Sequence, residues 1–169
     1  MLASKQVFDP PTKASISPTL TQIDLEAAAR LRGVIGRLSR RLRPTPAARA
    51  AGLTPTKITV LLTIVREGPV RLSELGEAEG INPTQLSRTV AQLLEGALVE
   101  RSADEGDRRA AWVKATPAGR RLAERIRRER TDALNAALQE LTVEERERIL
   151  AALDGLEQLA EQLRKGQQP

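Results

Sequence analysis

The sequence predicts a mainly α fold of the α+β class, in which a short stretch of β structure interrupts a series of helices. Apolar residues recur at helical spacing over most of the chain, whereas the segment 98–115 breaks this spacing. Aromatic residues make up only 1% of the 169 residues, so the core must consist of Leu, Ile, Val and Ala, which suits packed helices. With 40% hydrophobic residues, the chain can bury the core of one ordinary domain but hardly two.

The N-terminal part of the chain predicts a tail followed by one long helix. Residues 1–16 lack a sustained apolar repeat, and we interpret them as a disordered tail. Ser17 is a suitable cap and Pro18 a suitable first-turn residue, after which apolar residues repeat at helical spacing. We expect this helix over 17–43, because proline at position 44 disfavours helical geometry in the residue before it.

The centre of the chain predicts short elements, in which each helix begins at a capping residue and ends at a glycine. We expect a helix from Thr54-Pro55 to Gly68, a strand over 70–72, a helix capped by Ser73 and closed by Gly80, and a helix from Asn82-Pro83 to Gly96.

The remaining segments predict a hairpin and two C-terminal helices. In 98–115 two apolar stretches enclose the polar residues 103–107, which indicates a two-stranded hairpin. Thr116 and the proline after it begin a long helix. A capping box that starts at Thr142 opens a last helix, whose apolar residues continue to Leu163.

The order strand, helix, tight turn, helix and hairpin, over about 54–116, is that of a winged helix-turn-helix, whose second helix enters the DNA major groove. The charges agree with this interpretation. The first helix of the pair carries Glu74, Glu77 and Glu79, whereas residues 82–94 contain no acid, as a phosphate-facing surface requires. The formal net charge of +5 also favours a polyanionic partner.

Polar side chains on the second helix of the pair lie outside its apolar stripe, and we expect them to contact bases or phosphates. The candidates are Asn82, Thr84, Gln85, Ser87, Arg88 and Gln92. Arg88 can bond a guanine through two hydrogen bonds, and Gln85 can do the same to an adenine. The alternative is an ordinary solvated helix face.

The predicted hairpin contains a second candidate contact, formed by Asp107, Arg108 and Arg109. An arginine just past the turn can reach a minor groove, and a neighbouring carboxylate can hold its guanidinium. The alternative is a solvated hairpin tip.

Four segments resemble the MarR family of bacterial transcription regulators. They are Gly68–Leu75, the helix from Asn82, Gly96–Arg101, and Asp107–Arg109 followed by Thr116–Gly119. The resemblance runs from about Leu53 to Leu163 and implies an obligate homodimer built from a single domain over 17–165. It implies a DNA-binding lobe, and an all-helical dimerisation lobe from both chain ends, 17–43 and 117–165. It also implies that Arg109 reaches the minor groove and that Asp107 holds it.

The chain lacks both Cys and His, which excludes disulfides, thiol redox chemistry, imidazole bases and the commonest zinc sites. We therefore expect no enzyme, no cofactor and no metal. Family members that sense peroxide or zinc use those two residue types, so we expect an organic effector, anionic or lipophilic. Arg37 and Arg41 of the basic first helix are its candidate partners.

No apolar run approaches the roughly 18–20 residues that cross a bilayer, and we expect a cytoplasmic protein without membrane contact. We predict a sequence-specific transcription regulator that binds double-stranded DNA. Our hypothesis is a ligand-responsive repressor on a pseudo-palindromic operator, and the repressor role is what the family resemblance implies. The alternative is an architectural DNA-binding protein without an effector.

Overall fold

The computed structural model describes residues 22–43, 45–102 and 112–166. The chain divides into one unit that ends at Leu38 and a second unit that begins at Ser39. The described part of the first unit belongs to helix α1 (Gln22–Leu42), and the last residues of this helix belong to the second unit.

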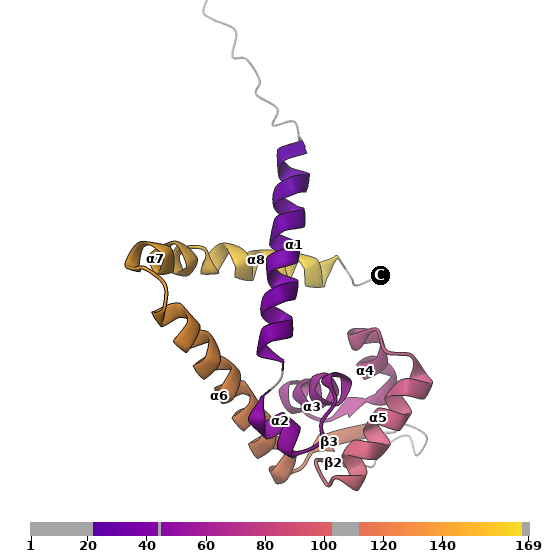
Figure 1. The fold of residues 1–169 in the computed structure, drawn as a ribbon. Coiled ribbons are helices and arrows are strands. Elements are labelled where there is room, and N and C mark those ends of the chain that lie inside the picture. The colour runs from indigo at the N-terminus through magenta and orange to yellow at the C-terminus, as the bar shows by residue number, and fades with distance from the viewer. Residues whose placement is uncertain (1–21, 44, 103–111, 167–169) are drawn as a thin grey trace, which may run out of the picture. The chain divides into compact units, whose positions relative to one another are not determined.

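The second unit contains the predicted order of short helices and strands (Figure 1). Its elements are α2 (Pro46–Ala50), α3 (Pro55–Glu67), β1 (Val70–Arg71), α4 (Leu72–Glu79), α5 (Pro83–Glu95), β2 (Val99–Ser102), β3 (Trp112–Ala115), α6 (Pro117–Gln139), α7 (Val143–Ala151) and α8 (Leu153–Lys165).

The strands form one antiparallel sheet in the order β1-β3-β2. Val70 pairs with Val113 across β1 and β3, and Val99 pairs with Ala115 across β2 and β3. These four side chains are buried and join the core cluster that α3, α4 and α5 complete with aliphatic residues. The predicted aliphatic core and winged helix-turn-helix order are therefore confirmed.

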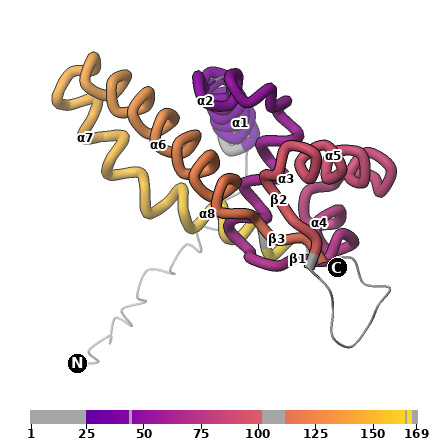
Figure 2. The backbone as a smooth tube through the Cα atoms, turned by 90° about the horizontal axis from the view of Figure 1, so that it is seen from below, coloured from indigo at the N-terminus to yellow at the C-terminus, as the bar shows by residue number. Residues whose placement is uncertain are grey.

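Helix α6 starts at the sheet and continues into the C-terminal helices. It packs against α2 and α3, with Ala123 and Ile126 fully buried. Figure 2 shows α6 leading away from β3, with α7 following at its far end. No helix in the described ranges combines the length and the apolar character that spanning a membrane requires.

Gly119 allows α6 to begin directly against the sheet. A Cβ atom at this position would lie 1.9 Å from the carbonyl oxygen of Leu98, which is closer than any side chain tolerates. The Thr116 hydroxyl donates to the carbonyls of Ala97 and Leu98 and accepts the Gly119 amide at 3.0 Å. This joint therefore fixes the start of α6 to the end of the turn that follows α5.

Several predicted helix boundaries are confirmed by their capping hydrogen bonds or backbone conformation. The Thr54 hydroxyl accepts the Lys57 amide, and Gly80 closes α4 in the left-handed conformation with φ 61°. Thr142 and Glu145 form both halves of the predicted capping box, with the Glu145 carboxylate 3.0 Å from the Thr142 amide.

Three features of the elements differ from the prediction. Helix α4 begins at Leu72 and not after Ser73, because the chain turns from the two-residue strand β1 directly into the helix, with Arg71 as an N-cap that makes no side-chain bond. The helix expected after Thr142 is two helices, since the Ala152 amide donates to the Ile149 carbonyl, three residues back, at 3.2 Å and interrupts the α pattern. Helix α2 was not predicted at all.

Candidate nucleic-acid interface

Helix α5 separates its side chains into a buried face and an exposed face. Leu86, Val90 and Leu93 are buried in the core. The predicted contact residues lie on the other face and are all exposed: Asn82, Thr84, Gln85, Ser87, Arg88 and Gln92. The structure thus brings these six candidates together on one helix and its cap.

Asn82, a predicted DNA contact, has a structural role at the start of α5. Its side-chain oxygen accepts the Gln85 backbone amide at 2.9 Å, and Pro83 occupies the first helical position, where a missing N–H costs nothing. Thr89 is a polar residue on the buried side, and its hydroxyl donates to the Gln85 carbonyl at 2.8 Å. The Thr89 hydroxyl is therefore engaged within α5 and does not belong to the exposed face of this helix.

The charge contrast between α4 and α5 persists in the structure. Helix α4 carries three acids, whereas α5 has Arg88 on its exposed face and a single acid, Glu95, at its last position. Arg88 is exposed and can therefore reach a partner beyond the protein surface. The first three turns of α5 consequently present hydrogen-bonding groups and one cation without an opposing carboxylate of their own.

The hairpin contributes cationic groups near its two described strands. Lys114 of β3 lies 3.2 Å from the Glu100 carboxylate of β2, and the two residues are partners in the sheet register. The Arg71 guanidinium lies 5.1 Å from the centre of the Trp112 ring. This cation–π pair was not predicted, because the pairing of β1 with β3 has no local signal in the sequence. Asp107, Arg108 and Arg109 lie outside the described residues.

A separate pocket of about 290 Å³ contains two arginines. It is lined by Ser39, Leu42, Arg43, Pro55, Thr59 and Arg130. These residues come from the end of α1, the start of α3 and the middle of α6. None of the described lining residues is an acid. The pocket therefore suits an anion, with the hydroxyls of Ser39 and Thr59 as additional donors.

Arg130 is partly buried in this pocket, beside the positive charge of Arg43. Burial lowers the pKa of Arg130 from its ordinary value, and the positive charge of Arg43 lowers it further. Within the described ranges, its Nε is a buried side-chain nitrogen without a hydrogen-bond partner. Among the described residues that line the pocket, no carboxylate offsets the two positive charges.

Arg37 and Arg41, the predicted effector partners, do not line this pocket. Both are exposed, and Arg37 belongs to the first unit of the chain. Sequence reasoning could not select Arg43 and Arg130 from the many arginines, since they lie far apart in the chain and only tertiary packing joins them.

The wall beside this pocket is held by a hydrogen bond between α2 and α6. The Glu129 carboxylate accepts the Ala47 backbone amide at 2.9 Å. Thr45 is buried and caps α2 by accepting the Ala48 amide at 3.2 Å. The next residue along α6 after Glu129 is Arg130, so this bond fixes the helix at the pocket.

Comparisons with known proteins agree on one family and one fold. The family model described as the MarR family matches residues 51–110. A crystal structure of a transcriptional regulator protein from Pseudomonas aeruginosa is 30% identical, with a TM-score of 0.68 over 83% of this chain and 97% of that chain. An HTH-type transcriptional regulator of Mycobacterium tuberculosis is 28% identical over 131 residues, 78% of this chain and 90% of the relative.

The structure of wild-type MarR from Escherichia coli in its apo form is similar in fold. It is 21% identical, with a TM-score of 0.67 over 76% of this chain and 94% of that chain. The matched range 51–110 includes α3, α4 and α5, and therefore all six candidate contact residues of the α5 region.

Proposed function

Because the chain belongs to the MarR family of transcription regulators, we propose that it is a ligand-responsive repressor that binds a pseudo-palindromic operator as a homodimer. The chain is a DNA-binding regulator of transcription with a winged helix-turn-helix fold.

The exposed face of α5 is the observation that carries the DNA-reading part. Its donors and acceptors, with Arg88 and Gln85 among them, match the side chains that distinguish base pairs in a major groove. Asp107, Arg108 and Arg109 would add a contact from the wing, with Arg109 in the adjacent minor groove.

Exposed leucines support the homodimer. Helices α7 and α8 bury none of their apolar side chains within one chain, and Leu153 and Leu163 are 45% and 61% exposed. Such a row of apolar residues is typical of a surface that a second copy covers. Two copies would place their α5 helices in successive major grooves, about 34 Å apart.

The operator test is selection of DNA from random pools by the full-length protein, followed by footprinting. We expect a pseudo-palindrome whose half-sites are centred about one helical turn apart. Enrichment without any sequence preference would instead indicate the alternative, an architectural DNA-binding protein without an effector.

The effector site in this proposal is the pocket with Arg43 and Arg130, and its ligand is an organic anion. Burial and then the charge of Arg43 lower the pKa of Arg130, and an anion there would offset the repulsion between the two guanidinium groups. Release of DNA requires that the ligand bind the two states of the protein unequally, since equal affinity shifts no population.

Operator affinity measured against a panel of aromatic acids, lipophilic drugs, peroxide and zinc tests the effector part. We expect release by at least one acid and none by peroxide or zinc. Arg130→Gln should abolish the response, whereas Arg41→Gln, at an exposed position that does not line the pocket, should keep it. Loss of the response in Arg41→Gln alone would contradict this site and favour the basic face of α1.

A further inference from the structure

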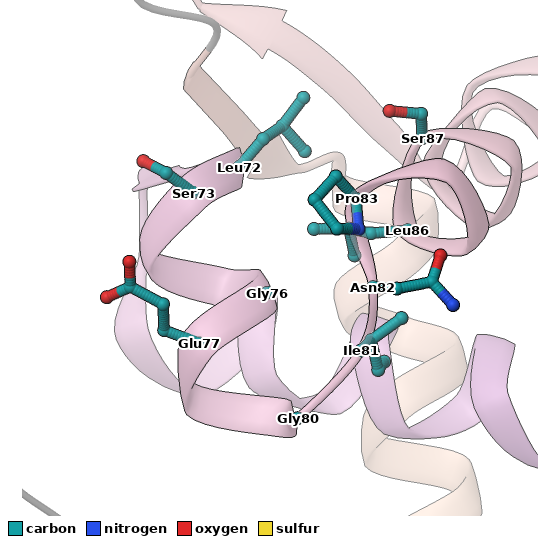
Figure 3. Close-up of a pocket in the computed structure, with 10 residues that line it drawn as sticks. All are labelled: Leu72, Ser73, Gly76, Glu77, Gly80, Ile81, Asn82, Pro83, Leu86 and Ser87. Atoms are coloured by element: carbon teal, nitrogen blue, oxygen red, sulfur yellow. The ribbon is translucent and has the colours of Figure 1, made fainter.

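A second and larger cavity, of about 670 Å³, lies between α4 and the first turns of α5, and we call it the α4–α5 groove. Figure 3 shows Ser73 and Glu77 at the edge of the groove away from α5, and Pro83 and Leu86 on the α5 side. A volume of this size, with apolar walls and a few polar groups, is typical of small-molecule sites.

Two glycines line this groove, and one of them allows α4 to pack closely on α5. Gly76 of α4 and Gly80, the C-cap of this helix, line the groove without adding side chains to it. A Cβ at Gly76 would meet the Ile81 carbonyl oxygen at 3.3 Å and the Leu86 side chain at 3.4 Å, so the two helices approach closely at this point. The apolar surfaces of Leu72, Pro83 and Leu86 are left to line the cavity.

The charge of the residues that line the groove favours a cationic ligand. Of the described residues that line it, only Glu77 is charged, and α4 as a whole carries three acids and no base. A phosphate or a carboxylate would be repelled here, whereas a positive charge on an apolar body would be attracted. The groove is therefore opposite in character to the pocket of Arg43 and Arg130.

The groove also shares residues with the proposed DNA-reading surface. Asn82 and Ser87 line it and belong to the candidate contacts of the α5 region. An occupant would thus lie directly beside the part of α5 that enters the major groove in the proposed function.

We propose that the α4–α5 groove binds a small lipophilic cation, that Glu77 is its charged partner, and that its occupant competes directly with DNA. The competition rests on the proposed function, whereas the binding of the cation does not. Direct competition differs from release through the Arg43 and Arg130 pocket, because it needs no change in the spacing of two recognition helices.

Binding is tested first without DNA, with the full-length protein and the fluorescent lipophilic cation rhodamine 6G. We expect a saturable rise in fluorescence anisotropy. Glu77→Gln should weaken the affinity by about 3- to 5-fold, the range of a partly solvated ion pair, and added salt should weaken the wild type. Glu74→Gln removes the same charge from the same helix at a residue that does not line the groove, so its affinity should stay that of the wild type.

The second arm adds the selected operator to the protein loaded with rhodamine 6G. We expect the DNA to displace the cation, while Glu77→Gln binds DNA at least as tightly as the wild type. Absence of saturable binding, or equal weakening by Glu77→Gln and Glu74→Gln, would overturn the site. Simultaneous binding of cation and DNA would overturn the competition. A wild type that binds no DNA even without the cation would refute the proposed function instead, and the first arm would still decide the site.

Discussion

The side chain of Asn82 can divide two tasks between its two polar atoms. Its oxygen accepts the Gln85 amide and caps α5, so the cap leaves the NH₂ group as the part that can contact DNA. The stability of the helix and the affinity for DNA should therefore respond differently to substitution at this residue.

Asn82→Ala and Asn82→Asp separate these tasks. Asn82→Ala should lower the free energy of unfolding by about 1 kcal/mol, because it removes the cap. Asn82→Asp keeps a capping oxygen and should preserve stability, yet it places a negative charge beside the proposed phosphate contacts and should weaken DNA binding. Urea unfolding followed by the fluorescence of Trp112, together with DNA titrations, measures both quantities. Equal DNA affinity of Asn82→Asp and the wild type would place Asn82 away from DNA.

Arg88→Ala should abolish the preference for the operator over unrelated DNA. A bidentate contact to a base discriminates against the wrong base by about 1–3 kcal/mol, and a homodimer would lose this contact twice. Competition titrations with operator and scrambled DNA give the specificity ratio. Arg148→Ala, on α7, removes the same charge at an exposed position and is the control. An unchanged ratio in Arg88→Ala would remove this residue from the reading surface.

At the scale of elements, the helix boundaries that could be predicted are those with local signals. Thr54, Asn82 and Thr116 each precede a proline and each accept a backbone amide of their own helix, which needs no distant partner. The exposed and buried faces of α5 follow equally from local spacing, so the six candidate contact residues could be predicted as a set.

The boundaries that were missed depend on the rest of the fold. Helix α2 has the same Thr-Pro signal at Thr45, but it is only five residues long and is held from outside by Glu129 of α6. The break between α7 and α8 occurs at Ala152, a strong helix former, so its position has no compositional mark. The Arg43 and Arg130 pocket likewise arises only when distant elements pack together.

Gly119→Ala should be strongly destabilising, by about 2–4 kcal/mol, because backbone has to move to relieve the overlap with the Leu98 carbonyl. The neighbouring Ala118 is exposed in the first turn of the same helix, and Ala118→Gly should cost no more than about 1 kcal/mol. Urea denaturation compares the two variants. Similar midpoints for both would show that the joint between α6 and the sheet yields easily.

At the scale of the whole molecule, the C-terminal helix exposes an apolar surface to water. Helix α8 repeats Leu153, Leu156 and Leu163 along one chain, and all three are exposed. Leaving several leucines in water forfeits roughly 1.5–3 kcal/mol for each side chain that a partner could bury fully. This cost is the physical reason to expect association of two copies through these helices.

Deletion of the chain from Thr142 onward should convert the proposed homodimer into a monomer, because it removes both α7 and α8. Sedimentation velocity on the full chain and on the shortened chain gives the masses, and circular dichroism checks that the winged helix-turn-helix is still folded. Leu156→Glu offers a milder test, since one charge in a dimer contact should weaken association, whereas Gln158→Glu changes the charge equally at an exposed polar position of α8. The shortened chain should protect one half-site and not the full operator, because a single α5 can occupy only one half-site. A well-folded monomer that still protects the full pseudo-palindrome with wild-type affinity would show that two linked copies are not needed for operator recognition.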